Sequence, residues 1–258
     1  MPSAIQRDAQ LRDKGLVTVL METQFDKPQF VEPFVWQRLQ GAGSALVCTD
    51  CRSGASFPDV HGLPHAAIVG VDGTLVWMGL QLADERAFQE AIDKELAKVK
   101  AGWGSTPEVR KVRALLYGGG KLAEAQRALA AVKDEAESKT LQNEVKAVFD
   151  RTARSVRSLQ DEGRWLEAQE VAKNLQKNCA GVADWAPQLT EMTASFATPE
   201  GRTELADDGK LAKVLRAWRE DKLKGDVAKA IDGIARTAKG KVGERCQRIV
   251  KALTAPLQ

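Results

Sequence analysis

The sequence is poor in histidine, cysteine and tyrosine, three residue types that supply many catalytic and metal-binding groups. Its 258 residues include only two histidines, four cysteines and one tyrosine. Four cysteines do not make a disulfide scaffold in a chain of this length. No apolar run approaches the roughly 20 residues of a membrane helix, and no phosphate-binding loop, nucleophile elbow or supported carboxylate pair is present. We therefore predict no cofactor and no transmembrane segment.

A strong charge bias is also absent. The net charge is +3, with the excess of basic residues in residues 105–258. Nucleic-acid-binding domains usually have a pI above about 9 and clustered basic residues, so we predict no nucleic-acid partner. The N-terminus lacks the basic-then-apolar pattern of a secretion signal. This start predicts a cytoplasmic protein, or a periplasmic or exported one if the native N-terminus is longer.

What the sequence does contain is a strong hairpin signal in residues 62–79. Residues 66–71 form an apolar, partly β-branched run that predicts a buried strand. Asp72 and Gly73 follow it, and Asp-Gly between two such runs favours a tight turn because glycine tolerates positive φ. The partner strand is expected at residues 74–78.

The same residues resemble the second half of a thioredoxin fold in its TlpA/redoxin-like branch. In that family a Gly-x-Pro with a cis proline precedes a strand, an acidic-Gly turn and a strand ending in glycine. Here the corresponding residues are Gly62, Leu63, Pro64 and, at the end of the hairpin, Gly79. The resemblance implies a cis peptide bond before Pro64 and backbone contacts from Leu63 to a substrate peptide. An ordinary proline at a strand start is the alternative interpretation.

The resemblance extends more weakly over residues 1–100. Periodicity predicts a helix at 3–14, strands at 16–21 and 44–50, and a helix at about 84–100. The family's first, central strand and its Cys-x-x-Cys are missing, so neighbouring strands would be left with unpaired backbone groups. The implied unit is an α/β thioredoxin-like domain at 1–101 that lacks this strand, and we hypothesise that the native product is longer.

Residues 108–254 predict an all-α, helical-repeat-like domain after a linker at 102–107. Alanine, leucine, lysine, glutamate, glutamine and arginine dominate beyond the linker. The segments 120–126 and 163–169 match at an offset of 43 residues, and each begins with a glycine before a helix. They resemble a tetratricopeptide-like helix pair, although the period exceeds the 34 residues of that repeat.

Cys48 and Cys51 form a Cys-x-x-Cys and are the candidate catalytic residues. The first thiol of a reactive pair usually begins a helix, where the dipole favours the thiolate, whereas Cys48 is predicted to end a strand. A buried cysteine and an incidental loop cysteine are the alternative. With His61 and His65 the pair has ligand types suited to zinc, but a glycine and a proline between the histidines exclude the usual helix. We predict no metal.

Two functions follow from these observations. In the first, suggested by the resemblance, the chain is a thiol–disulfide oxidoreductase that acts on protein thiols and disulfides and is inactive if the family's Cys-x-x-Cys is absent. In the second, it is a non-catalytic interaction module that binds peptides or partner helices. The two remaining cysteines, Cys179 and Cys246, are isolated in predicted helices and are expected to be buried.

Overall fold

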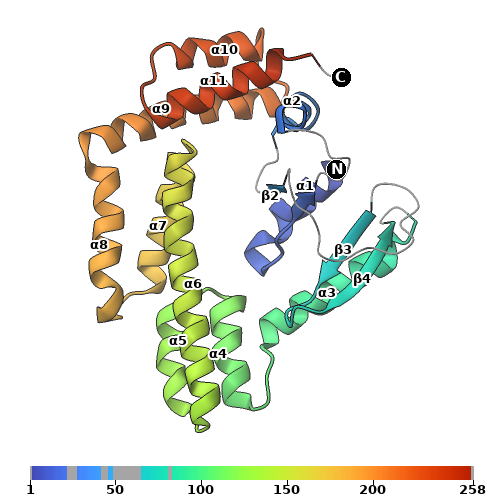
Figure 1. Cartoon of the computed structure of the whole chain (residues 1–258), viewed down its shortest axis with the longest axis vertical. Helices are drawn as coiled ribbons and strands as arrows, with labels where there is room; N and C mark the ends of the chain where they lie inside the picture. The colour runs from blue at the N-terminus through green and yellow to red at the C-terminus, as the bar shows by residue number, and fades with distance from the viewer. Residues whose placement is uncertain (1, 22–27, 42–45, 49–64, 81–82, 257–258) are drawn as a thin grey trace.

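The computed structural model of the chain is mostly helical (Figure 1). It describes residues 2–21, 28–41, 46–48, 65–80 and 83–256. Helices α4 to α11 follow an arc that begins after α3, and the elements of the first hundred residues lie on the open side of this arc (Figure 1). The chain is therefore organised by helix packing rather than by a central sheet.

Short elements make up the part of the chain before residue 84. In order, they are α1 (Pro2–Leu11), the 3-10 helix η1 (Arg12–Lys14), β1 (Val19–Met21), α2 (Pro28–Leu39), β2 (Leu46–Cys48), β3 (His65–Val69) and β4 (Leu75–Leu80). Gly15 ends the first helical segment at φ 104°, as expected for a glycine at a C-cap. Helix α3 (Glu85–Ala101) follows, and Asp84 caps its N-terminus by accepting a hydrogen bond from the amide of Ala87.

The prediction of an α/β thioredoxin-like domain at residues 1–101 is wrong, because the described strands do not form one sheet. Among the described residues β1 pairs only with β2, in parallel, and β3 pairs only with β4, antiparallel. A helix that connects two parallel strands normally packs back on their sheet. Instead, α2 packs on α11 (Lys241–Thr254), at the far end of the chain. The described molecule is therefore mostly α.

The predicted hairpin is confirmed. In its ladder Ala67 lies opposite Met78 and Ile68 opposite Trp77. Asp72 fixes the turn by accepting hydrogen bonds from the amide and the hydroxyl of Thr74, at 3.0 and 2.6 Å, while Gly73 takes φ 81°. A positive φ at this position is the reason that Asp-Gly predicts such turns.

Every regular element described after residue 106 is a helix, in agreement with the composition. The elements are α4 (Pro107–Gly118), α5 (Leu122–Ala128), η2 (Leu129–Ala131), α6 (Glu135–Asp161), α7 (Trp165–Asn178), η3 (Ala183–Trp185), α8 (Ala186–Ala194), η4 (Ser195–Ala197), α9 (Pro199–Arg219), α10 (Val227–Ala235) and α11. The two glycines of the internal match, Gly120 and Gly163, both have positive φ and precede α5 and α7. Ala125 and Ala168, at equivalent places in the match, are both fully buried. Small residues at these positions allow each new helix to pack closely against the preceding one.

Two apolar cores stabilise the helical arc. The larger core runs from α4 to η4 and includes Phe149, whose ring stacks on Trp185 with centroids 4.6 Å apart. The smaller core joins α9, α10 and α11 around Leu211, Ile231 and Ile249. By contrast, the described residues give the core beneath the hairpin three buried members, Ile68, Phe88 and Ile92. Most of the buried apolar side chains among the described residues therefore belong to the helical arc.

Candidate protein-interaction surface

The structure does not bring the predicted catalytic and substrate-binding residues together. Cys48 is the last residue of β2, where it lies in register with Met21 of β1. Its side chain, and Cys51, Leu63 and Pro64 as a whole, lie outside the described residues. The predicted dithiol and the predicted peptide contact at Leu63 and Pro64 therefore stay predictions.

The two cysteines whose side chains are described are poorly suited to thiol chemistry. Cys179 and Cys246 are both buried, as predicted, and neither forms a disulfide. Desolvation raises the pKa of Cys179 to about 12 and the pKa of Cys246 to about 11. Since the thiolate is the reactive form, these cysteines serve as packing residues.

The buried carboxylates of α9 have structural partners. Glu204 accepts hydrogen bonds from the amides of Lys241 and Val242, at 2.7 and 3.0 Å, and so caps the start of α11. Asp208 accepts one from the amide of Leu166 at 2.8 Å, in the first turn of α7, and pairs with Arg245 at 3.1 Å. Neither α7 nor α11 has a capping side chain of its own. Helix α9 therefore supplies the missing caps for two other helices.

Burial dominates the electrostatics of this ion pair. Desolvation raises the pKa of Asp208 and lowers the pKa of Arg245, although each charge favours ionisation of the other. The pair costs free energy to bury and holds α7, α9 and α11 in one arrangement. Within the described ranges no group of three or more His, Cys, Asp or Glu side chains could hold a metal ion. These carboxylates are therefore assigned a structural role.

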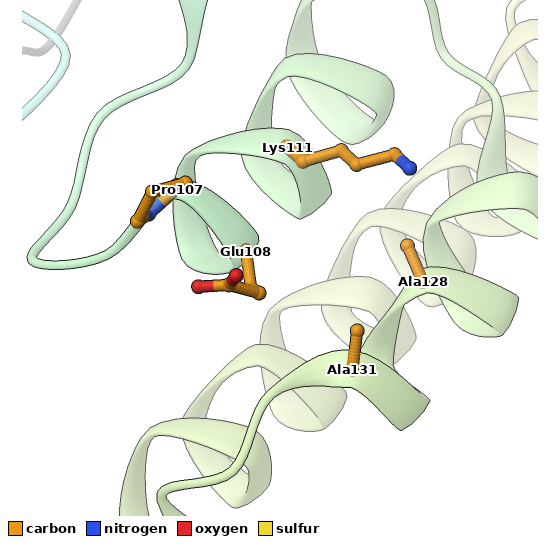
Figure 2. Close-up of a pocket in the computed structure, with 5 residues that line it drawn as sticks. All are labelled: Pro107, Glu108, Lys111, Ala128 and Ala131. Carbon is orange, nitrogen blue, oxygen red and sulfur yellow. The ribbon is translucent and has the colours of Figure 1, made fainter.

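A cavity of about 260 Å³ lies between the first turn of α4 and the end of α5 with η2 (Figure 2). Its lining consists of Pro107, Glu108, Lys111, Ala128 and Ala131. The charged side chains Glu108 and Lys111 are both exposed. Without a buried polar group in its lining, this cavity offers no arrangement for acid–base or nucleophilic chemistry.

The most distinctive surface is the uncovered face of the β3–β4 hairpin. One face, which includes Ile68 and Trp77, packs on α3. The opposite face carries exposed apolar side chains at Val69 (64% exposed) and Leu75 (54%). Val76 and Met78 of β4 are exposed as well, and a bulge at Val76 interrupts the alternation of faces along this strand. We call Val69, Leu75, Val76 and Met78 the hairpin patch.

Contacts with α3 fix the hairpin that carries the hairpin patch. The Trp77 and Phe88 rings meet edge to face with centroids 4.8 Å apart. Glu95 of α3 is buried and accepts a hydrogen bond from the amide of Val71 at 3.1 Å. At Gly70 a Cβ atom would lie 2.8 Å from that carboxylate, so the close approach needs glycine. These contacts tie the hairpin to α3.

The sequence indicated the strands of this surface but not its exposure. The run at 66–71 is apolar at nearly every position, which is typical of a strand covered on both faces. Among the described elements, α3 covers one face of the hairpin, and Val69 and Leu75 remain exposed. A two-stranded hairpin with one uncovered apolar face differs from the buried strand that the run predicts. The four side chains of the hairpin patch could therefore be recognised only after folding.

Comparisons with protein-family models, with curated proteins and with solved structures found no match to this chain. Within the described residues no helix is both long and apolar enough to cross a bilayer, in agreement with the prediction from hydropathy.

Proposed function

We propose that this chain is a non-catalytic protein-interaction module that binds an extended apolar segment of a partner protein at the hairpin patch. The observation that carries the proposal is the group of exposed apolar side chains on β3 and β4. Half of the eight large apolar side chains exposed in the described structure belong to this one hairpin. A contiguous exposed apolar patch is typical of a binding surface.

The size of the patch favours a peptide over a folded domain. Its four side chains expose on the order of 250 Å² of apolar surface. A stable protein–protein interface buries about 800 Å² per partner. A segment of about five residues with apolar side chains at alternate positions matches the smaller area, because alternate residues of a strand point to one face.

The backbone of the hairpin adds a second means of recognition. The sheet has two strands, so the outer edge of β4 has no strand beside it among the described residues. Such an edge offers amide and carbonyl groups to an incoming strand. Leu75, Val76 and Met78 all belong to β4. A strand added at this edge would therefore gain backbone hydrogen bonds and apolar contacts together.

A binding assay with matched variants tests the proposal. The probe is a fluorescently labelled hexapeptide of alternating valine and threonine, and binding is followed by anisotropy. We expect the double variant Val69→Thr with Leu75→Thr to bind at least about tenfold more weakly than the unchanged chain. Threonine keeps the β propensity of these positions while removing apolar contact area.

The control is Leu166→Gln, which removes an exposed apolar side chain from α7, away from the hairpin. Its affinity for the peptide should equal that of the unchanged chain. Equal affinity of all three proteins would contradict the proposal, as would an absence of peptide binding by the unchanged chain at millimolar concentration. Circular dichroism establishes that each variant is folded.

We propose thiol–disulfide exchange as a second candidate function, and one observation favours it. Cys48 is the last residue of β2, in register with Met21 at the carboxyl end of the parallel pair β1–β2, and it precedes Cys51 by three residues. The Cys48 thiolate would attack a partner disulfide, and Cys51 would then displace the partner thiol, leaving the pair oxidised and the substrate reduced. Reduction of insulin disulfides tests this, since Cys48→Ser must abolish any activity that the pair supplies.

A further inference from the structure

Helix α2 packs on the end of the chain rather than on the strands that it connects. Its extensive helix contact is with α11, and none of comparable extent with β1 or β2 occurs among the described residues. Figure 1 shows α2 beside α11, close to the C-terminus. The position of α2 is therefore set by α9, α10 and α11, which share the smaller apolar core.

Three residues of α2 and its C-terminal turn make specific contacts with this layer. Trp36 packs against the core that α9, α10 and α11 share. The side-chain amide of Gln37 donates to the carbonyl oxygens of Ala252 and Ala255, at 2.8 and 2.7 Å. The guanidinium of Arg219, the last residue of α9, donates through Nε to the carbonyl oxygen of Gln40 at 3.2 Å.

The two helix ends cap each other. A carbonyl in the last turn of a helix has no partner within that helix, and Gln37 supplies partners at the end of α11. Both amide protons of this side chain are used. In return Arg219 satisfies a carbonyl just beyond α2. Recognition thus combines one aromatic anchor with hydrogen bonds that depend on the relative position of the two helix ends.

The contact is close as well as specific. Gly41 is buried and has φ 88°. A Cβ atom at this position would lie 3.2 Å from both the Trp36 ring and the Arg219 guanidinium. Burial lowers the pKa of Arg219, because its guanidinium is partly desolvated at this contact. The turn after α2 therefore fits against the layer only because residue 41 has no side chain.

We propose that α9, α10 and α11 form a receptor for the C-terminal turn of a helix, and that α2 is its tethered ligand. The same receptor binds α2 of a second copy of the chain when its own α2 is displaced. The occupant is set by sequence: a helix with adjacent tryptophan and glutamine in its last turns, followed by a glycine that accepts positive φ. This proposal is independent of the hairpin patch.

Competition between the tethered and the free ligand provides the test. The probe is a labelled peptide of residues 28–41, and the receptor is the full-length chain. A tethered ligand acts at a millimolar effective concentration, so the unchanged chain should bind the peptide weakly. The double variant Trp36→Ala with Gln37→Ala weakens the tethered ligand while leaving the receptor intact. We expect it to bind the peptide at least about tenfold more tightly.

The matched controls use the same helix. Phe34 is exposed on α2, so Phe34→Ala in the chain should leave peptide binding as weak as in the unchanged protein. A peptide carrying Trp36→Ala should not bind the double variant. Gln37→Ala alone keeps the apolar contact of Trp36, so this variant should bind the peptide with intermediate affinity. It provides a second measurement if the double variant does not fold.

Two results would overturn the proposal. One is equal affinity of the peptide for the unchanged chain and for the folded double variant, since the tethered helix would then not compete. The other is no binding to any folded variant at millimolar peptide. Thermal unfolding followed by circular dichroism establishes folding in each case.

Discussion

The regions before residue 102 and after residue 106 differ in how they satisfy backbone hydrogen bonds and bury apolar side chains. In the helical region each helix satisfies most of its backbone hydrogen bonds internally, and packing then builds a continuous core of 18 buried residues from α4 to η4. In the first region short strands need neighbours distant in sequence, and the described strands form two separate pairs. Locally satisfied elements can therefore build a core from any adjacent helix, whereas strands depend on the whole sheet.

The largest expected effect comes from removing one aromatic ring from each core, which tests whether the two regions contribute unequally to stability. Phe149 is 1% exposed and stacked on Trp185. We expect Phe149→Ala to lower the free energy of unfolding by about 3–5 kcal/mol, because it removes apolar contacts and leaves a cavity. Urea denaturation followed by circular dichroism measures this effect.

Phe88→Ala is the counterpart in the small hairpin core. It should change the main urea transition much less, because that transition reports chiefly on helices remote from the hairpin. Amide hydrogen exchange should instead accelerate in residues 65–80, where α3 no longer supports the strands. Equal losses of global stability from the two substitutions would show that the regions unfold as one unit.

The next largest loss of stability is expected from breaking the ion pair that joins α7, α9 and α11. Asp208→Ala removes the cap of α7 and leaves Arg245 buried without its counter-charge. We expect a loss of about 3 kcal/mol in the free energy of unfolding, again from urea denaturation. Lys210→Ala, which breaks the more exposed pair with Asp207, should change stability by less than about 1 kcal/mol. Similar effects of both would contradict the capping role.

The reactivity of the buried thiols tests how firmly the helical region is packed, without any substitution in either core. Cys179 and Cys246 have raised pKa values and are buried. At pH 8 they should not react with a disulfide reagent until the protein is denatured, when both should react within minutes. Mass spectrometry of the labelled protein identifies the sites. Rapid labelling of either residue in the native protein would show that the helical core opens readily.

The smallest expected effect concerns the hairpin turn. Hydrogen bonds from Thr74 hold the pKa of Asp72 below its ordinary value. A lowered pKa in the folded state means that this carboxylate stabilises the turn above its unfolded pKa, and that the contribution is lost as the pH falls through the folded value. Titration by NMR should show the lowered pKa, and Thr74→Val should return it toward the ordinary value.

Sequence patterns predicted individual elements well and their assembly poorly. The Asp72–Gly73 turn and the helix at 84–100 are found as expected, because both depend on neighbours within a few residues. The resemblance to a thioredoxin fold depended on a sheet assembled across the first hundred residues, and the described strands do not form it. The hairpin patch escaped prediction since an apolar strand run does not say how many of its faces are covered.

By itself, the sequence determined much of the local structure: the Asp72–Gly73 turn, the helix at 84–100, and the burial of Cys179 and Cys246. Only the tertiary structure decided that Asp208 caps α7, that α2 packs on α11, and that Val69 and Leu75 face outward. The physical reason is the sequence separation over which each kind of interaction acts. Capping and turn propensities act over a few residues, whereas these contacts join positions tens to hundreds of residues apart, and their free energies exist only after the chain has folded.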